Sequence, residues 1–97
     1  MVEETNRVHQ WVEKGLGSIG RLRILRTLAS DEATTQTKYS LEKSTGLKPI
    51  DVRKHLKVLI EAGWVQEFDY NPPTYALNRH DPKTKFLITF FKQIGYL

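Results

Sequence analysis

Apolar residues repeat every three or four positions in the first thirty residues, which is the spacing of helices that bury one face. The first group of these residues is Val8, Trp11, Val12 and Leu16. It predicts an N-terminal helix within residues 1–17, ending near two glycines. The second group is Leu22, Leu25 and Leu28. It predicts a second helix over residues 18–29.

The middle of the chain combines polar spacers with helix start and stop signals. Residues 30–37 are polar and are expected to form a loop, with Thr37 as the N-cap of a short helix over 38–45. That helix is expected to bury Tyr39 and Leu41. A glycine at 46 should end it. Pro49 suits the first position of a helix, so a longer helix is predicted from 49 to 62, stopped by the glycine at 63.

The last third predicts a hairpin followed by a helix. Residues 64–68 alternate between apolar and polar, residues 69–74 are rich in turn formers, and residues 75–78 return as a partner strand. Two prolines belong at the tip because they cannot donate to a sheet ladder. Asp81 and Pro82 form an N-cap and first-turn pair, which opens a final helix to about Tyr96. The fold class is therefore mainly α with a small β-hairpin.

The segment from Tyr39 to Val65 consists of a short helix, a turn at Gly46, a helix with a basic outer face, and a strand. This order resembles the helix-turn-helix and first wing strand of winged-helix transcriptional regulators. The run V-x-x-H-L-K-x-L-x-x-x-G from Val52 to Gly63 is similar to recognition helices of the ArsR-like and MarR-like groups. The resemblance implies one domain over residues 1–97. It would contain an N-terminal helix (1–17), a winged-helix core (18–80) and a C-terminal helix (81–97). The resemblance to short, cysteine-free regulators of this kind suggests an archaeal source.

Composition and charge narrow the class of partner. The chain has 97 residues, a net charge of +4 and no cysteine, which excludes disulfides and cysteine-ligated metals. It contains no apolar run of membrane-spanning length, and its first residues lack the pattern of a signal peptide. A cytoplasmic protein is therefore expected. Residues 46–58 hold four basic residues and one acidic residue, which favours a polyanionic partner.

The resemblance implies that the outward face of the 49–62 helix enters the major groove of DNA. The candidate contacts there are Lys48, Ile50, Asp51, Arg53, Lys54 and Lys57. Arg53 is the best candidate for recognising guanine, since its guanidinium can engage O6 and N7 together. Asp51 could instead stabilise the first helical turn, and Lys48 stands where Ser or Thr would cap the helix.

Further contacts are expected from the wing and the second helix. The wing candidates for the minor groove or backbone are Tyr70, Asn71, Thr74 and Arg79. Three arginines of the second helix, Arg21, Arg23 and Arg26, could contact phosphates or simply solubilise the surface.

The final helix carries more apolar surface than a small winged core can cover, which favours a homodimer. The candidate interface residues are Val8, Trp11, Val12, Phe86, Leu87, Phe90, Phe91 and Ile94. A symmetric dimer would favour a palindromic DNA site. Alternatively, both end helices could close the core of a monomer.

The residues of this chain give little indication of catalysis or metal binding. The three histidines are isolated, and a G-x-G-x-x-G match from Gly15 to Gly20 follows no predicted strand. We therefore expect no enzyme activity and no cofactor. The sequence predicts a sequence-specific, double-stranded DNA-binding transcriptional regulator. The alternatives are a winged-helix protein-interaction adaptor and an RNA-binding winged helix.

Overall fold

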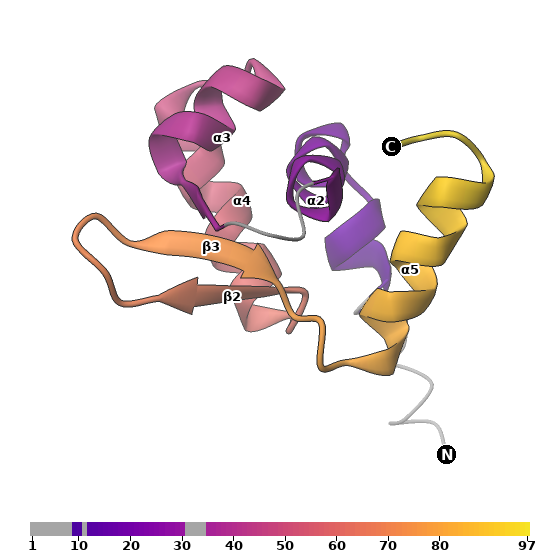
Figure 1. The fold of residues 1–97 in the computed structure, drawn as a ribbon. Helices are drawn as coiled ribbons and strands as arrows, with labels where there is room; N and C mark the ends of the chain where they lie inside the picture. The colour runs from indigo at the N-terminus through magenta and orange to yellow at the C-terminus, as the bar shows by residue number, and fades with distance from the viewer. Residues whose placement is uncertain (1–8, 11, 31–34) are drawn as a thin grey trace.

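A computed structural model describes residues 9–10, 12–30 and 35–97 of the chain. In chain order its elements are α2 (Ile19–Ser30), β1 (Gln36–Thr37), α3 (Lys38–Thr45), α4 (Pro49–Glu61), β2 (Val65–Phe68), β3 (Thr74–Leu77) and α5 (Pro82–Gln93) (Figure 1). Residues 12–16, before α2, are also helical. The predicted fold class is confirmed: the protein is mainly helical, with a small antiparallel sheet.

The sheet has three strands rather than the predicted two. Its order is β1-β3-β2, so β3 is central and pairs antiparallel with both neighbours. Thr74 lies opposite Thr37 on one side and opposite Phe68 on the other. The prediction that Gln36 and Thr37 belong to a loop was wrong. A strand of two residues has no alternation to detect, and only its pairing with β3 defines it.

Local capping chemistry explains most helix boundaries. The Thr37 hydroxyl oxygen accepts a hydrogen bond from the Ser40 N–H at 3.1 Å, and the Asp81 carboxylate accepts one from the Lys83 N–H at 3.0 Å. Both are N-cap interactions that satisfy a free donor of the first turn. Gly46, directly after α3, has a φ of 74°. This left-handed conformation favours glycine and reverses the chain toward α4.

The hydrophobic core lies between the helices and the inner face of the sheet. Its largest fully buried side chains include Trp64, Tyr75, Ile24, Leu25 and Leu41. Helix α2 packs against α3, α4 and β3, and is therefore the central element.

Tyr39 was predicted to be buried, and this is wrong: 64% of its surface is exposed. Tyr39 lies on the outer side of α3, where the Lys43 ammonium sits over its ring at 5.0 Å from the ring centroid. Leu41, predicted from the same pattern, is fully buried. One turn of α3 thus places its leucine inward and its tyrosine in solvent.

Helix α5 ends earlier than predicted, at Gln93 rather than near Tyr96. Gly95 adopts a φ of 74°, and the Tyr96 N–H then donates to the Phe91 carbonyl at 2.8 Å. This reversal is a Schellman-type ending. It returns the Tyr96 ring edge-on to the Phe91 ring, with 4.9 Å between the centroids.

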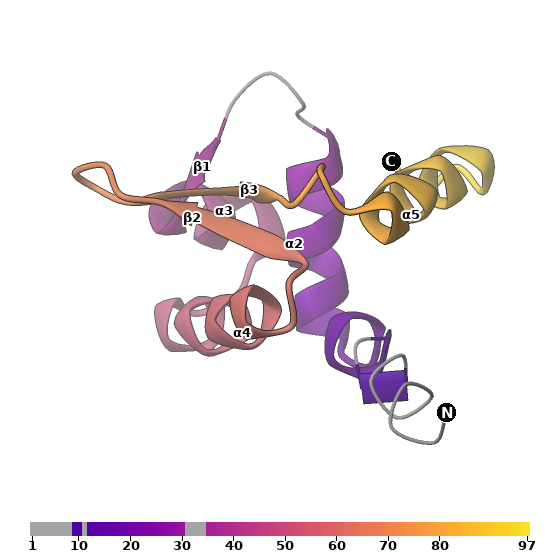
Figure 2. The ribbon, with the colours of Figure 1, turned by 90° about the horizontal axis from the view of Figure 1, so that it is seen from below.

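The two ends of the molecule have different compositions. The hairpin of β2 and β3 projects away from the body on one side, while α5 lies on the opposite side, with α2 between them (Figures 1 and 2). Helices α3 and α4 lie on the hairpin side of α2 (Figure 2). A basic helix and a hairpin therefore occupy one end, and an aromatic-rich helix occupies the other.

Candidate nucleic-acid interface

Helix α4 has a sharply divided surface. Val52, Leu56 and Leu59 are buried and fix the helix against the core. Arg53, Lys54 and Lys57 are exposed on the outer side. This alternation follows from helical geometry, because positions three and four apart share a face. The structure therefore presents three cations on a rigidly anchored helix.

The first turn of α4 adds two more exposed candidates. Lys48 occupies the N-cap position without a side-chain capping hydrogen bond, as expected for a residue that carries only donors. Ile50 is 49% exposed, so its side chain is free to meet an apolar group such as a thymine methyl. Asp51 is half-buried, and its carboxylate makes no hydrogen bond with a described residue. Asp51 does lie in the first turn of α4, where its charge opposes the helix dipole.

His55 faces the inner flank of α4 rather than the outer face. Burial lowers the pKa of His55 below its usual value, the charge of Arg21 lowers it further, and the charge of Asp51 partly opposes both effects. Its Nδ1 atom is buried without a hydrogen-bond partner among the described residues. The ring therefore serves to pack α4 against α2, where it meets Gly20.

A groove runs between the outer face of α4 and the sheet. It encloses about 290 Å³ and is lined in part by Lys38, Arg53, Lys57, Glu67 and Tyr75. Burial, together with the charge and hydrogen bond of Glu67, raises the pKa of Tyr75 to about 12. The phenol therefore stays neutral and bonded to Glu67. Among the described residues, three cations and two acidic side chains, Glu61 and Glu67, line this groove together with Leu56 and Ile60, so its formal charges nearly balance.

At the tip of the hairpin, Tyr70 and Asn71 are exposed, and the Asn71–Pro72 peptide is cis. The Tyr70 ring stacks on Phe68, with 6.3 Å between centroids. Both predicted wing residues are therefore accessible at the end of the hairpin.

Two other wing candidates occupy different surroundings from those expected. Thr74 belongs to β3, and its hydroxyl oxygen is buried without a hydrogen-bond partner among the described residues. Arg79 donates from Nη2 to the Leu28 carbonyl of α2 at 3.1 Å. The Thr74 hydroxyl is therefore turned into the protein, whereas Arg79 is half-exposed with one guanidinium nitrogen bonded to α2. Among the four wing candidates, Tyr70 and Asn71 are the most accessible.

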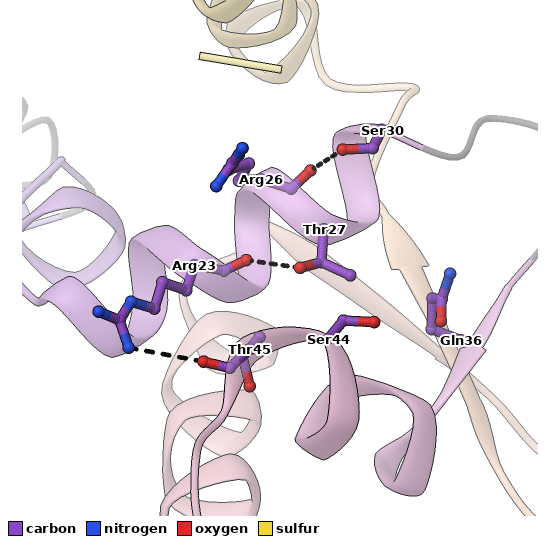
Figure 3. A pocket seen from close by; sticks show the side chains of 7 residues that line it. All are labelled: Arg23, Arg26, Thr27, Ser30, Gln36, Ser44 and Thr45. Atoms are coloured by element: carbon purple, nitrogen blue, oxygen red, sulfur yellow. Dashed lines mark hydrogen bonds between the residues drawn. The ribbon is translucent and has the colours of Figure 1, made fainter.

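The arginines of α2 lie in another part of the surface. Arg23 donates from Nη1 to the Thr45 carbonyl at 3.5 Å (Figure 3). The Arg26 guanidinium lies over the Tyr96 ring, 5.1 Å from its centroid. These two side chains border a cavity between α2 and α3. Sequence patterns could not predict this cavity, because its walls come from segments that are distant along the chain.

The apolar stripe of α5 divides into two sets. Phe86, Phe90 and Ile94 are exposed, with exposed fractions of 74%, 53% and 58%, and Val12 is exposed as well. Leu87 and Phe91 were also predicted as interface residues. They are buried in the core, with exposed fractions of 7% and 2%. Two further predicted interface residues, Val8 and Trp11, lie outside the described residues.

Two of these exposed residues, Phe90 and Ile94, also line an apolar groove of about 340 Å³. Its walls are Leu16, Leu22, Leu87, Phe90, Phe91, Ile94 and Tyr96. The groove therefore lies where residues 12–16, α2 and α5 meet.

Within the described part of the chain, no three His, Cys, Asp or Glu side chains come together in a way that could hold a metal ion. No helix over the same residues is long and apolar enough to cross a membrane.

No protein-family model matches this sequence, and no curated protein matches it. Solved structures do share its fold. The homodimeric winged helix-turn-helix DNA-binding domain of Mb0332 from Mycobacterium bovis, a possible ArsR-family transcriptional regulator, is 19% identical. It superposes with a TM-score of 0.77 over 97% of this chain and 82% of its own. HlyU from Vibrio cholerae is 17% identical, with a TM-score of 0.80 and complete coverage of both chains.

Two further structures extend the likeness. The transcriptional repressor BigR from Xylella fastidiosa is 23% identical, with a TM-score of 0.76 over 97% of this chain and 91% of its own. A MarR-family transcriptional regulator from Silicibacter pomeroyi is 17% identical, with a TM-score of 0.65 over 95% of this chain and 64% of its own. The chain therefore has the winged helix-turn-helix fold of ArsR-like and MarR-like transcriptional regulators, as the sequence predicted.

Proposed function

We propose that this protein is a cytoplasmic, sequence-specific transcriptional regulator that binds double-stranded DNA through α4. The observation that carries the proposal is the exposed cationic face of a helix whose other side is locked into the core. A helix fits the major groove of B-DNA, and cations on its outer side neutralise phosphates. The fold supports the same function, since it is shared with DNA-binding regulators.

Within that face we assign different roles to the cations. Arg53 recognises guanine, because its planar guanidinium can donate two hydrogen bonds to one base edge. Lys54 and Lys57 contact phosphates, as does Lys48 at the start of the helix. Ile50 packs on a thymine methyl, and Asp51 lies beside them in the first turn. Tyr70 and Asn71 contact the sugar-phosphate backbone or minor groove from the wing, with Thr74 and Arg79 supporting the hairpin behind them.

We further propose that two copies associate through α5 and the N-terminal helix. The exposed residues Phe86, Phe90 and Ile94 leave an aromatic surface that water solvates poorly. Leu87 and Phe91 support this surface from below. The similar Mb0332 domain is described as homodimeric. A two-fold dimer would set its recognition helices roughly 34–36 Å apart and favour a palindromic operator.

The same aromatic surface favours one second candidate, a winged-helix adaptor that binds another protein instead of DNA. An adaptor would need this surface but not the cations of α4. The two functions therefore differ in which residues they require.

The test is fluorescence-anisotropy titration of a duplex of about 30 base pairs across a salt series. We expect affinity to fall steeply with salt, and the Arg53→Ala/Lys54→Ala variant to bind more weakly with a flatter salt dependence. The matched control is Lys14→Ala/Lys85→Ala, which removes the same charge from residues outside α4 and should have a much smaller effect.

Two results would contradict DNA binding through α4. One is the absence of binding even at low salt. The other is equal weakening by the two double variants, which would mean that only the net charge matters. Either result would turn attention to the Phe86–Phe90–Ile94 surface and a protein partner.

A further inference from the structure

A cavity of about 550 Å³ opens between α2, β1 and α3. Its walls are Arg23, Arg26, Thr27, Ser30, Gln36, Ser44 and Thr45 (Figure 3). Sites for small molecules typically enclose roughly 300–1,000 Å³, so the cavity could hold a compact ligand. Every wall residue in the described part of the chain is polar, and Arg23, Arg26, Ser30 and Ser44 are exposed, so the cavity opens to solvent.

The charged side chains that line this cavity, among the described residues, are all positive. It contains two arginines, and no acidic side chain of residues 9–10, 12–30 and 35–97 lines it. Arg23 makes one hydrogen bond, to the Thr45 carbonyl, at the long limit of 3.5 Å. The Arg26 guanidinium contacts the Tyr96 ring but makes no hydrogen bond with a described residue. Among the described residues, most of the ten guanidinium donors therefore have no partner, and an oxyanion is the group that their fork geometry fits best.

The hydroxyl groups offer the complementary chemistry. The Thr27 hydroxyl donates to the Arg23 carbonyl at 2.9 Å, and the Ser30 hydroxyl donates to the Arg26 carbonyl at 2.7 Å. The Thr45 hydroxyl donates to the Leu41 carbonyl at 2.6 Å. The Thr45 oxygen also accepts from the Leu47 N–H at 3.2 Å. Because the hydroxyl hydrogens of Thr27 and Ser30 are already used within α2, these two oxygens can serve a ligand only as acceptors. A ligand that uses them must supply donors of its own.

We propose that this cavity binds a small oxyanion that also carries hydroxyl groups, such as a phosphorylated or carboxylated polyol. The arginines hold the anionic group, and the hydroxyl oxygens of Thr27 and Ser30 accept from the ligand's hydroxyls. The site is separate from the proposed DNA surface, because none of its walls comes from α4, β2 or the wing tip. The inference does not depend on the function proposed above.

The test is a titration of the full-length, ¹⁵N-labelled protein, followed by two-dimensional NMR at constant ionic strength. The probes are inorganic phosphate and glycerol 3-phosphate, with sodium chloride as the compensating salt. We expect saturable shifts at the amides of Gln36, Ser44 and Thr45, with glycerol 3-phosphate binding more tightly than phosphate. Arg23→Gln and Arg26→Gln should each weaken binding about tenfold, since each removes charge-assisted hydrogen bonds. Lys85→Gln, which removes a distant exposed charge, should leave binding unchanged.

Several outcomes would overturn the proposal. Shifts that grow linearly without saturation, or saturation that persists in both arginine variants, would mean that no such site exists. Equal affinity for both probes would remove the role of the hydroxyl oxygens. If neither probe binds but Arg23→Gln weakens binding to duplex DNA, the arginines serve a DNA phosphate instead. The chemical-shift dispersion in the NMR spectrum of each variant shows whether that variant is folded.

Discussion

His55 of α4 packs directly over Gly20 of α2. A Cβ atom at Gly20 would overlap the imidazole of His55 at Nε2. The absence of a side chain at Gly20 is thus what lets α4 approach α2. The sequence offered no reason to single out this glycine, because the contact joins positions 35 residues apart.

Replacing Gly20 should therefore be costly. We expect Gly20→Ala to lower the free energy of unfolding by roughly 1–3 kcal/mol, because the added methyl has to push the ring or the helix aside. Chemical denaturation measures this loss. In a double-mutant cycle, His55→Ala should recover much of it by opening space. Independent, additive losses would contradict direct crowding between the two residues.

The same histidine predicts a pH dependence of stability. Burial and Arg21 depress the pKa of folded His55 below its ordinary value of 6.5, so the folded state takes up this proton less readily than the unfolded chain. Above about pH 6.5 neither the folded nor the unfolded state binds this proton, so His55 does not change the stability there. Stability falls as the pH drops through about 6.5 toward the folded pKa, because the unfolded state binds more protons there. Urea denaturation at about pH 7.5 and about pH 5.5 should show a smaller loss in His55→Gln than in the wild type. His9 and His80 are common to both proteins and cancel, so identical losses would refute the role of His55.

Arg53 and Lys57 should be separable by their effects on DNA. Arg53→Ala should cost roughly 1–3 kcal/mol on a preferred site and relax base preference, whereas Lys57→Ala should weaken binding to all sequences and reduce the salt slope by about one. Parallel titrations of specific and random duplexes measure both. Equal behaviour of the two variants on both duplexes would contradict this division of roles.

Single residues also mark where sequence analysis was weakest. Tyr39 and Thr74 were placed by local pattern alone, yet one is exposed and the other has a buried hydroxyl. Arg79 was expected beside DNA, and one nitrogen of its guanidinium bonds to α2. The surroundings of Thr74 and Arg79 come from segments remote in the chain, whereas Tyr39 meets Lys43 of its own helix. A helical or turn pattern fixes spacing but cannot show which remote neighbour covers a side chain.

At the scale of elements, prediction succeeded where start and stop chemistry was strong. Thr37, Gly46, Pro49, Gly63 and Asp81 each mark a helix or turn boundary through capping or a special backbone conformation. Strand β1 was missed because two residues carry no periodicity. The end of α5 was placed too late, because Tyr96 continues the apolar spacing even though Gly95 has already reversed the chain.

The start of α4 is the element boundary most open to improvement. Lys48 supplies no capping oxygen there. Lys48→Ser should raise the free energy of unfolding by roughly 0.5–2 kcal/mol, since a hydroxyl could accept a free N–H of the first turn. The same change should weaken DNA binding by removing a cation. Thr37→Ala, which deletes the existing cap of α3, should lower stability by a similar amount and serves as the opposing control. A loss of stability in Lys48→Ser, measured by denaturation, would contradict this view of the boundary.

For the whole molecule, the two sets of apolar residues on α5 should behave differently. Phe86→Ser/Phe90→Ser alters exposed side chains, so we expect dissociation of the dimer with the fold retained. Phe91→Ala empties a core position and should cost roughly 3–5 kcal/mol of stability. Light scattering after size-exclusion chromatography measures mass, and denaturation measures stability. A wild-type monomer, or an unchanged dimer in the double serine variant, would show that this surface does not pair two copies.

The arrangement of the molecule places a cationic helix and a wing at one end and an aromatic surface at the other (Figures 1 and 2). That separation would allow DNA binding and self-association without competition. The most direct test is an NMR titration of the labelled protein with a short duplex, which locates the bound surface residue by residue. We predict the largest shifts at the amides of residues 50–57 and of Tyr70 and Asn71 at the wing tip, with α5 unaffected apart from dimer contacts. Shifts concentrated on α5, or none at a saturating duplex concentration, would contradict DNA recognition by α4.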